Sequence, residues 1–392
     1  MKIGLVLNRT PSNSEKFLIS KIKGLQQNGH QVIMFAHKDD NFNLCEVVDM
    51  PKVSNIFFLQ IIKMIMAYIS IIFKSPIAAA KFLIYEKLDG RPFRHRWENL
   101  YLNSKILNAK LNWIHFCFST TVIRKENVAR SIKAKMSISL RGYDINIYPL
   151  KNHNCYSILW QKVDKVHSIS NSLLEKAKDY GLKSSVDKKV IFPAINTNRF
   201  RNKKIKSELN LNRTIEILTV ARLNWIKGLE YTIEAVSKLN SVRFNYRIVG
   251  SGSDYERLVL AINQLDLTNK VKLMGYIPHE KITSYYERAD LYIQYSIEEG
   301  FCNAVLEAQS MGVLTIVSDA SGLSENIIHG KTGWVVPKRE PILLAEKIKQ
   351  ILLMENKKLD QIRLNGIRRV ENKFELNSQN QQFNRFFNED LF

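Results

Sequence analysis

Apolar and polar residues alternate most regularly in the second half of the chain. Short apolar runs predict strands there, and the segments between them repeat apolar residues at helical spacing. Leu229, Ile233, Val236 and Leu239 form one such helical stripe. We therefore predict a complete βαβ domain over residues 213–375. Its strands are expected at about 215–222, 244–250, 271–275, 291–296, 315–319 and 333–336.

The first half begins with a similar alternation. Lys2–Asn8 predicts a strand, Phe17–Leu25 a helix, and Gln31–Ala36 a second strand. This order of elements predicts a parallel, doubly wound sheet in a first domain that spans residues 1–195. Further strands are expected at 113–118, 136–140, 165–170 and 189–193.

Two segments fall outside this alternation. The polar stretch 196–212, rich in Lys and Asn, predicts an interdomain linker. The tail 376–392 ends in Phe386, Phe387, Leu391 and Phe392, and we expect it to form a helix that packs back on the first domain.

An unusually apolar stretch, Ile56–Phe73, is interrupted only by Gln60, Lys63 and Ser70. Its length is at the short limit for a transmembrane helix, and the lysine argues against spanning. Several basic residues follow it closely. Apolar surface beside a basic run predicts helices at about 53–96 that lie on the face of an anionic membrane. The alternative is a buried core helix of the first domain.

Composition narrows the functional classes. The 392 residues are 45% hydrophobic and 24% charged, as in a globular protein, and the formal net charge is +21. Nucleic acid, anionic lipid and phosphorylated small molecules are all compatible with that charge. The chain has no zinc-finger spacing, aromatic RNA-binding motif or arginine-rich tail, so nucleic acid is not the partner we expect.

Cofactor, metal and targeting motifs are not found. The four cysteines have no spacing for zinc or a disulfide framework, which favours core positions in a reducing compartment. The first strand is not followed by Gly-x-Gly-x-x-Gly, so we expect no dinucleotide cofactor. The apolar start at Met1–Asn8 predicts a strand and not a signal peptide.

The candidate chemistry centres on the stretch Ser296–Glu307. Glu299 is expected in the loop at a helix entry, and Glu307 on the helix. The turn Gly300–Asn303 would present backbone N–H groups at the helix N-terminus, where a negative ligand group is favoured. Two acceptors that flank a row of amide donors suit a nucleotide sugar. The alternative is a pair of solvated surface glutamates.

Two strand ends carry cations. Arg222 ends one predicted strand, and Lys227 follows just before a helix, an arrangement suited to a diphosphate. Arg141 and Asp144 follow the strand at 136–140, where an open α/β sheet positions ligand groups. An ordinary turn with a salt bridge explains that second pair equally well. His115 is expected to be a core histidine.

Two glycine-marked turns are further candidates. Gly250 and Gly252 lie in a tight strand-to-helix turn that suits either a phosphate contact or a simple helix cap. Gly275 would let a flat base approach the backbone, beside Tyr276.

Together these residues resemble the group 1 (family four) glycosyltransferases of GT-B fold. The resemblance rests on Arg222…Lys227-Gly228, Val249–Gly252, the run from Glu299 to Glu307, and Gly322–Glu325 with Gly330-x-Thr-Gly333. Pro11…Ser14-Glu15-x-Phe17-Leu and Leu140–Asp144 look like the exopolysaccharide and colanic-acid-type members. The resemblance implies an α/β fold in which two Rossmann-like, doubly wound domains face each other across a cleft.

The resemblance also implies an activity: retaining transfer of a sugar from a UDP- or GDP-sugar, without an obligatory metal. Arg222 and Lys227 would neutralise the diphosphate, and Glu299 would position the sugar. Arg141 stands where many relatives have His, so no histidine role is carried over, and it would contact a donor or acceptor phosphate. Donor-binding residues would be Glu307, Gly300, Phe301, Cys302, Asn303, Gly250, Gly252 and Tyr276, and acceptor-side residues Ser14, Glu15 and Asp144.

The acceptor implied is a growing glycan, linked to a polyprenyl diphosphate, in surface polysaccharide biosynthesis. The protein is then expected in the cytoplasm, peripheral to the inner membrane surface. Other hypotheses are a different GT-B enzyme, such as a nucleotide-sugar epimerase or phosphorylase, a non-enzymatic binder of anionic polymers, and a lectin-like protein without turnover.

Overall fold

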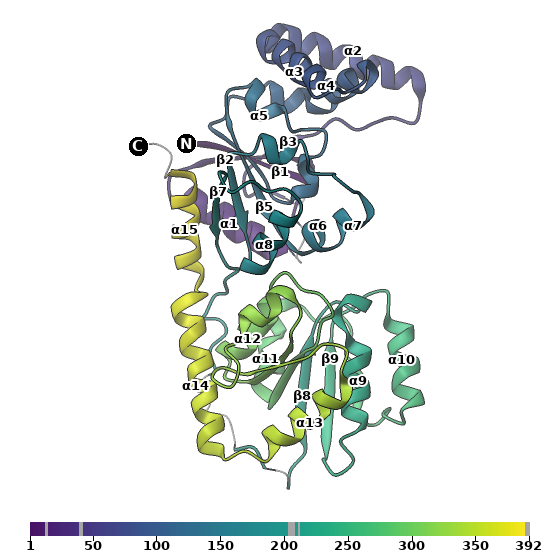
Figure 1. Ribbon diagram of the computed structural model, residues 1–392, viewed down its shortest axis with the longest axis vertical. Helices are drawn as coiled ribbons and strands as arrows, with labels where there is room; N and C mark the ends of the chain where they lie inside the picture. The colour runs from purple at the N-terminus through teal and green to yellow at the C-terminus, as the bar shows by residue number, and fades with distance from the viewer. Residues whose placement is uncertain (12–14, 39–41, 203–207, 211, 389–392) are drawn as a thin grey trace. The chain divides into compact units, whose positions relative to one another are not determined.

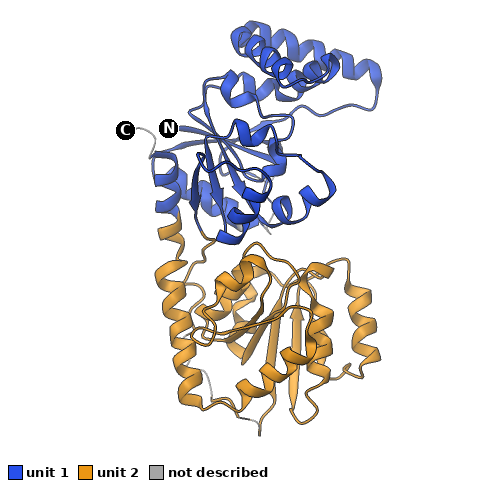
Figure 2. Cartoon of the chain, in the orientation of Figure 1, with its two compact units in different colours: residues 1–191, 380–392 blue, residues 192–379 orange. Residues whose placement is uncertain are grey.

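The computed structural model describes residues 1–11, 15–38, 42–202, 208–210 and 212–388. The chain divides into two compact units (Figure 2). Unit 1 comprises Met1–Ile191 with Asn380–Phe392, and unit 2 comprises Phe192–Gln379. The segment predicted as a linker begins within unit 2, and its residues 203–207 and 211 lie outside the described residues.

Unit 1 is built on a seven-stranded, wholly parallel sheet in the order β3-β2-β1-β4-β5-β6-β7 (Figure 1). Its central strands are buried along most of their length, which is why they appear as continuous apolar runs in the sequence. The strands are β1 Lys2–Arg9, β2 Gln31–His37, β3 Glu46–Asp49, β4 Trp113–Phe116, β5 Lys135–Leu140, β6 Lys165–Ser168 and β7 Asp187–Val190.

Unit 1 also contains helices of very different lengths. The long ones are α1 Lys16–Gln27, α2 Phe57–Lys74, α3 Pro76–Leu88, α4 Phe93–Leu107 and α8 Asn171–Asp179. The short ones are α5 Val128–Ser131, α6 Gly142–Asn146 and α7 Tyr148–Lys151, with 3-10 turns η2 Ser119–Val122 and η3 Leu159–Gln161.

The C-terminal helix α15, Leu376–Asn388, completes the core of unit 1. The rings of Phe386 and Phe387 are fully buried, and the centroids of Trp113 and Phe387 are 5.7 Å apart. Trp113 Nε1 also donates to the Phe387 carbonyl at 3.2 Å. Residues of the first strand and of the last helix therefore share one apolar core.

The apolar stretch predicted to be either membrane-facing or core forms α2, and its side chains are mostly exposed. Of its residues only Ile71 is buried, so the core-helix alternative is wrong. One side of α2 packs on α3 and α4: Tyr68 donates to the Trp97 carbonyl at 2.9 Å. Among the described helices, α2 alone has both the length and the apolar composition that crossing a membrane would require, which is weak evidence for a span.

Unit 2 contains a six-stranded parallel sheet in the order β10-β9-β8-β11-β12-β13. The order reverses between β8 and β11, and in such sheets ligands bind outside the carboxyl ends of the strands at this point. The strands are β8 Ile215–Val220, β9 Phe244–Val249, β10 Val271–Leu273, β11 Leu291–Gln294, β12 Leu314–Ser318 and β13 Trp334–Val336.

The helices of unit 2 follow the strands in alternation. They are α9 Leu229–Ser237, α10 Tyr255–Gln264, α11 Thr283–Arg288, α12 Asn303–Ser310, α13 Pro341–Leu352 and α14 Asn356–Lys373, with 3-10 turns η4 Trp225–Lys227, η5 His279–Lys281 and η6 Ser321–Asn326. The two Rossmann-like units confirm the predicted fold class.

Several local predictions were wrong. The short strand β3 and most of α4 were not predicted, and neither were η2 and α5, which follow β4. The C-terminal helix predicted within 376–392 is α15, which is separate from α14 because the backbone leaves helical geometry at Phe374. There Ile195 donates its amide to the Phe374 carbonyl, which a continuous helix would have used itself.

Candidate donor site in unit 2

The candidate site lies at the carboxyl edge of the unit 2 sheet, where the strand order reverses. Arg222 and Lys227 follow β8, and Glu299 follows β11, the neighbouring strand. Glu307 lies on α12, immediately beyond the same loop. Parallel strands bring their carboxyl ends to one edge, so residues far apart in the sequence meet there.

Lys227 and Glu299 form an ion pair between Nζ and Oε2. Both side chains are largely buried, at 12% and 14% exposure. Burial by itself lowers the pKa of Lys227, but the Glu299 carboxylate outweighs it and raises the pKa overall. The ammonium therefore stays charged, and the pair is a fixed dipole beside the sheet edge.

Three polar side chains, connected by successive hydrogen bonds, lead to the Glu299 carboxylate. Ser296 Oγ lies 3.3 Å from Glu299 Oε2, and Gln294 Nε2 donates to Ser296 Oγ at 3.0 Å. Tyr292 donates to Gln294 Oε1 at 2.8 Å. These three residues alternate along β11 and its end, so they lie on one face of the strand and hold the carboxylate in one orientation.

Gly228 makes the position of Lys227 possible. Its φ of +59° is left-handed, and a Cβ there would lie 2.2 Å from the Tyr295 carbonyl oxygen. The neighbouring backbone is joined to the Glu299 loop, since Ile297 donates its amide to the Ile226 carbonyl at 2.8 Å. The loops after β8 and β11 are thus held together by main-chain contact as well as by the ion pair.

Arg222 remains exposed and has no ion pair among the described residues. It lies near enough to Lys227 for its positive charge to oppose the raised pKa of that lysine. The backbone on both sides of Arg222 is anchored to the loop after β9: Ala221 donates to the Val249 carbonyl at 3.0 Å, and Leu223 to the Ser251 carbonyl at 2.9 Å. A fixed backbone therefore presents a free guanidinium.

Gly250 and Gly252 are required by that close approach. Cβ atoms at these positions would lie 1.9 Å from the Ala221 oxygen and 2.1 Å from the Leu223 oxygen, both in the loop that carries Arg222. Gly250 donates its amide to Gly275 and therefore has none to offer a phosphate. The glycines thus position the Arg222 loop, and Tyr276, which follows Gly275, is exposed at the same edge.

The turn at the start of α12 is held by Asn326, which the sequence prediction missed. Its Oδ1 accepts from the Cys302 amide at 3.2 Å, and its Nδ2 donates to the Cys302 carbonyl at 3.0 Å. The Cys302 amide is therefore already committed, contrary to the predicted ligand contact. Phe301 packs on Phe192 and Phe374, with centroids 5.5 and 5.6 Å apart, so its ring serves the core. The amides of Gly300 and Asn303 stay candidates.

Cys302 is buried close to the ion pair. Burial and then the Glu299 charge raise the pKa of its thiol to about 12, so it remains protonated at neutral pH. It is one of two buried cysteines, with Cys117, whereas Cys45 and Cys155 are half-buried, and all four are free thiols. Cys302, predicted as a donor-binding residue, is thus a small neutral group.

Glu307 has two partners that the sequence did not reveal. His279 Nε2 lies 3.1 Å from Oε1, and the Tyr286 hydroxyl donates to Oε2 at 2.9 Å. The carboxylate is only 7% exposed, so the solvated-surface alternative is wrong for it. Each carboxylate oxygen has a second lone pair, which leaves capacity for ligand hydroxyls. Burial raises the pKa of Tyr286 well above its ordinary value, and that phenol remains a donor.

The predicted residues of unit 1 form a separate group. Arg141 lies over the Phe17 ring, 3.6 Å from its centroid, and donates from Nε to the Cys117 carbonyl at 3.2 Å. Burial lowers the pKa of Arg141 to about 10, so it is still a cation at neutral pH. Glu15 is half-buried near it, and Ser14 lies outside the described residues.

Asp144, predicted on the acceptor side, has a structural role in unit 1. It is buried, and its two oxygens accept the amides of Ser119 and Arg141, each at 2.9 Å. By accepting the Arg141 amide, it satisfies a backbone N–H at the start of α6, as the N3 carboxylate of a capping box does. Because this carboxylate is buried and accepts two backbone amides, it positions the backbone of Arg141.

Unit 1 also buries a row of polar side chains. Lys21 Nζ lies 2.7 Å from His115 Nε2, and Ser139 Oγ lies 2.9 Å from the same nitrogen and 2.8 Å from His167 Nδ1. Burial lowers the pKa of Lys21 to about 7 and the pKa of both histidines well below the ordinary value. His115 is therefore a hydrogen-bonded core histidine, as expected.

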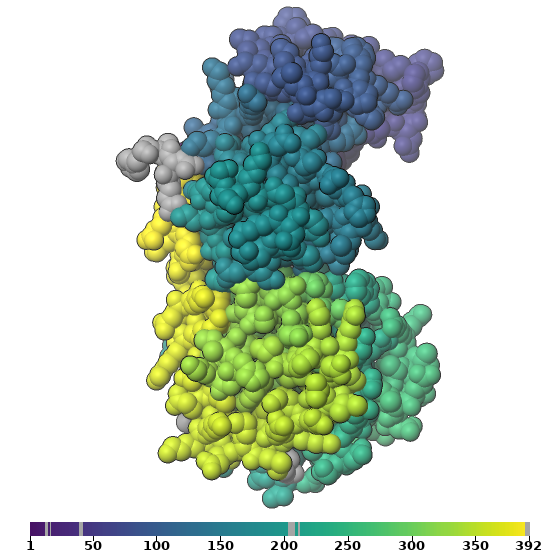
Figure 3. Space-filling view, viewed as in Figure 1, coloured from purple at the N-terminus to yellow at the C-terminus, as the bar shows by residue number. Residues whose placement is uncertain are grey.

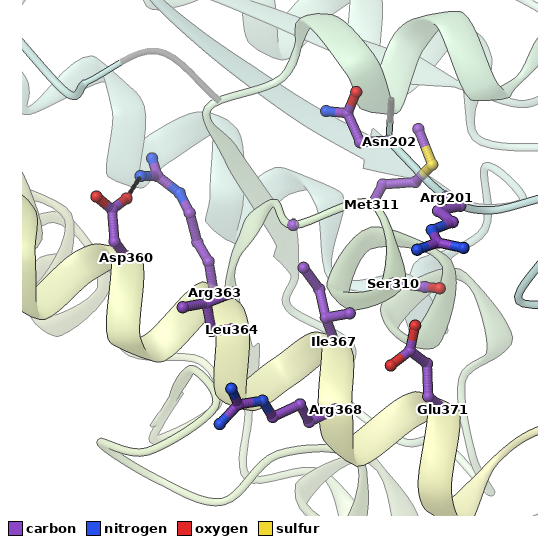
Figure 4. A pocket seen from close by; sticks show the side chains of 11 residues that line it. Arg201, Asn202, Ser310, Met311, Asp360, Arg363, Leu364, Ile367, Arg368 and Glu371 are labelled. Carbon is purple, nitrogen blue, oxygen red and sulfur yellow. Dashed lines mark hydrogen bonds and ion pairs between the residues drawn. The ribbon is translucent and has the colours of Figure 1, made fainter. Parts of the chain in front are cut away.

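A separate hollow in unit 2 does not belong to this site (Figure 4). It has a volume of about 540 Å³ and is lined by Ser310 and Gly312, at the end of α12, and by residues of α14 such as Arg363 and Glu371. Ser310 and Gly312 lie between α12 and β12, and therefore toward the edge of the sheet opposite to Glu299. No cluster of three or more potential metal ligands occurs in the part of the chain that the structure describes.

Comparison of the sequence with models of known protein families indicates the class of protein to which this fold and site correspond. Residues 200–369 match the family model for glycosyl transferases group 1, and this segment contains every candidate site residue of unit 2. The predicted resemblance to that family is therefore confirmed over this segment.

Individual relatives agree with the class. The chain is 26% identical over 264 residues to the putative colanic acid biosynthesis glycosyltransferase WcaL of Salmonella typhimurium, which covers 64% of this chain and 63% of the relative. It is 30% identical over 257 residues to the amylovoran biosynthesis glycosyltransferase AmsK of Erwinia amylovora, covering 62% and 61%. The chain thus spans somewhat less than two thirds of the length of these curated relatives.

Solved structures share the fold over the whole chain. A glycosyltransferase from Rickettsia africae superposes with a TM-score of 0.72 at 20% identity, covering 100% of this chain and 98% of that one. Anabaena HepE in complex with UDP superposes with a TM-score of 0.75 at 16% identity, covering 99% and 100%.

Proposed function

We propose that this protein is a retaining glycosyltransferase that moves a sugar from a UDP- or GDP-sugar to a growing glycan in surface polysaccharide biosynthesis. The observation that carries the proposal is the arrangement at the reversal point of unit 2: the Lys227–Glu299 pair, with Arg222 and Glu307 on the same edge. HepE, which shares the fold, binds UDP and UDP-glucose, and the relatives are named for exopolysaccharide synthesis.

Each residue has a role that follows from its chemistry. Arg222 has a free guanidinium for the diphosphate. Lys227 adds an ammonium group, which the Glu299 carboxylate keeps protonated by raising its pKa. As the sugar–phosphate bond breaks, negative charge develops on the diphosphate, and these preorganised cations stabilise it. Glu299, held through Ser296, accepts from sugar hydroxyls, and Glu307 from the ribose.

Attack on the same face as the departing phosphate fits this arrangement. Glu299 is committed to Lys227, so we assign it to positioning the sugar and not to forming a covalent bond with it. The acceptor hydroxyl loses its proton to the departing phosphate oxygen, and the product keeps the configuration of the donor. Arg141 in unit 1 is the candidate cation for an acceptor phosphate.

We further propose that the acceptor is lipid-linked and that the protein acts at the cytoplasmic face of the membrane. The exposed apolar side chains of α2 support this, as does the net charge of +21. A relative from Campylobacter jejuni is named for transfer to a diphospho-undecaprenol acceptor. Fractionation tests this part: a protein recovered wholly in the soluble fraction, without salt or detergent, contradicts it.

A thermal-shift screen of nucleoside diphosphates and nucleotide sugars tests the donor site, because a ligand that binds only the folded state raises its stability. We expect a shift with UDP or GDP and their sugars. Glu299→Gln should reduce turnover about a hundredfold and leave the shift with free nucleotide nearly intact. NMR of the product's anomeric proton decides between retention and inversion. Absence of any nucleotide shift would contradict the proposed function.

A further inference from the structure

A hollow of about 620 Å³ lies in unit 1 between α2 and α4, bordered by the loop after β3. None of the residues given a role above lines it. Side chains from the three segments line it, and one of them, Met66 of α2, is exposed. Figure 1 shows α2, α3 and α4 as a helical layer at one end of unit 1, and Figure 3 shows the same residues, in purple and blue, on the molecular surface.

The charge of this hollow is positive. Lys52, Lys63 and Lys105 line it, and none of the three forms an ion pair with a described residue. Among the described residues, Asp49 is the one carboxylate in the lining, and its Oδ1 accepts the Lys38 amide at 3.1 Å. With three ammonium groups and one carboxylate in its lining, the hollow favours binding of an anion.

The interior of the hollow contains polar groups without partners. The Ser104 side chain is buried, and its Oγ has no hydrogen-bond partner among the described residues. Asn108 donates from Nδ2 to Ser70 Oγ at 3.3 Å, while its Oδ1 is buried without a partner. Buried polar atoms are almost always satisfied, so these two indicate a ligand that supplies oxygens and hydroxyls.

The rim of the hollow is apolar. Met66 lines the hollow and is 66% exposed. Ile62 and Ile69 flank it on the same face of α2, and Phe73, one turn further, is 84% exposed. The positive hollow and the apolar stripe therefore meet at Met66. A ligand that matches both has an anionic head and a hydrocarbon chain.

We propose that the hollow binds the phosphate-bearing headgroup of a membrane lipid, whose hydrocarbon chain lies along the exposed face of α2. The lysines neutralise the phosphate, and the hydroxyl of Ser104 donates to one of its oxygens. This inference rests on the proposed membrane location but not on glycosyl transfer. It also gives α2 a fixed depth, because a bound headgroup holds the helix at the lipid–water boundary.

Vesicle flotation with the full-length protein tests the proposal. The vesicles are phosphatidylcholine alone or with about 20 mol% phosphatidylglycerol, at constant ionic strength. The variant K63Q/K105Q should bind the anionic vesicles about tenfold more weakly. The matched control K357Q/K358Q loses the same charge from exposed positions on α14 and should stay within about twofold of the native protein.

A pocket-filling variant separates the hollow from general charge attraction. Ala67 lies on α2 and lines the hollow, so A67F fills it without changing any charge. We expect the same loss of vesicle binding as in K63Q/K105Q. If A67F binds the anionic vesicles like the native protein, or if K63Q/K105Q and K357Q/K358Q weaken this binding equally, the headgroup site is wrong and only surface charge acts.

Two further measurements decide the remaining outcomes. The first is the melting temperature with inorganic phosphate and with anionic vesicles. If phosphate raises it as strongly as the vesicles do, and the vesicles do not affect phosphate binding, the site is one for free phosphate and the lipid assignment is overturned. The thermal shift with UDP or GDP is measured on every variant. A variant that keeps this shift but loses vesicle binding supports the headgroup site. If UDP and GDP cause no shift in the native protein, only the proposed glycosyl transfer is contradicted.

Discussion

The Lys227 ammonium and the Glu299 carboxylate form an ion pair between the loops that follow β8 and β11, the two strands at which the order of the unit 2 sheet reverses. Glu299 thereby sets the charge state of Lys227, and Lys227 sets the orientation of Glu299. The roles proposed for Arg222 and Glu307 depend on where this pair lies in the site.

Breaking this pair from one side should destabilise the protein strongly. Lys227→Met leaves the Glu299 carboxylate buried without its partner, and we expect a loss of about 3 kcal/mol in the free energy of unfolding. Adding Glu299→Leu should recover much of that loss, because no buried charge then remains. Urea unfolding of the two single variants and the double variant measures the coupling, and strictly additive effects would show that the pair is not coupled.

Glu307 is expected to be needed for nucleotide binding. Glu307→Gln keeps an acceptor for Tyr286 but removes the charge, and should weaken binding of UDP or GDP about tenfold. Isothermal titration measures this. Glu346→Gln, on the exposed face of α13, loses the same charge and should bind nucleotide like the native protein. Equal affinities of all three proteins would remove Glu307 from the site.

Gly252 should not tolerate a side chain. A Cβ would lie 2.1 Å from the Leu223 oxygen, so Gly252→Ala must displace the loop that carries Arg222. We expect at least about tenfold weaker nucleotide binding, together with a lower melting temperature. Gly29→Ala, in unit 1, is the control, because no atom lies within 4 Å of its added Cβ, although its φ of +78° carries a small strain. Equal nucleotide affinities of the two variants would show that the Leu223 contact does not fix Arg222.

Asn326 is expected to hold the turn at the start of α12. Asn326→Leu leaves both the amide and the carbonyl of Cys302 without their partner, at a cost of about 2 kcal/mol. Hydrogen exchange measured by mass spectrometry should accelerate over residues 299–303 in particular. Exchange that rises equally over all of unit 2 would indicate general destabilisation in place of this local role.

Lys21 should make the stability of the protein depend on pH. Burial lowers its pKa to about 7, whereas the unfolded residue titrates near 10.4, so the unfolded state binds more protons between these values. Stability should therefore rise with pH over this window, by up to about 1.4 kcal/mol per pH unit, and Lys21→Met should remove that rise. Urea unfolding at several pH values measures the slope. The exposed Lys23→Met should keep the native slope, and a Lys21→Met slope equal to it would refute the assignment.

Most of the secondary structure of unit 2 could be predicted, because its strands are buried on both faces. A strand such as β12 is buried at every position, and only burial between helices on both faces favours a run of apolar and small uncharged residues. The helices between the strands show one apolar face for the same reason. In unit 1, β3 (Glu46–Asp49) was missed because its two end residues are exposed and its two valines only half-buried, so it lacks any such run.

The site could be predicted only in part. Glu299, Glu307, Arg222 and Lys227 occur in a recognisable order along the chain. His279, Tyr286 and Asn326 were missed because nothing near them in the sequence indicates that they contact Glu307 or Cys302.

The sequence by itself determined the order of strands and helices, the two Rossmann-like units and the residue types at the carboxyl edge of the second sheet, because periodic burial and helix entry are local properties. Only the tertiary structure decided that α2 is exposed, that Asp144 caps a helix, and that Lys227 and Glu299 pair. Those outcomes depend on contacts between residues far apart in the chain, and the free energy of such contacts does not appear in any local pattern.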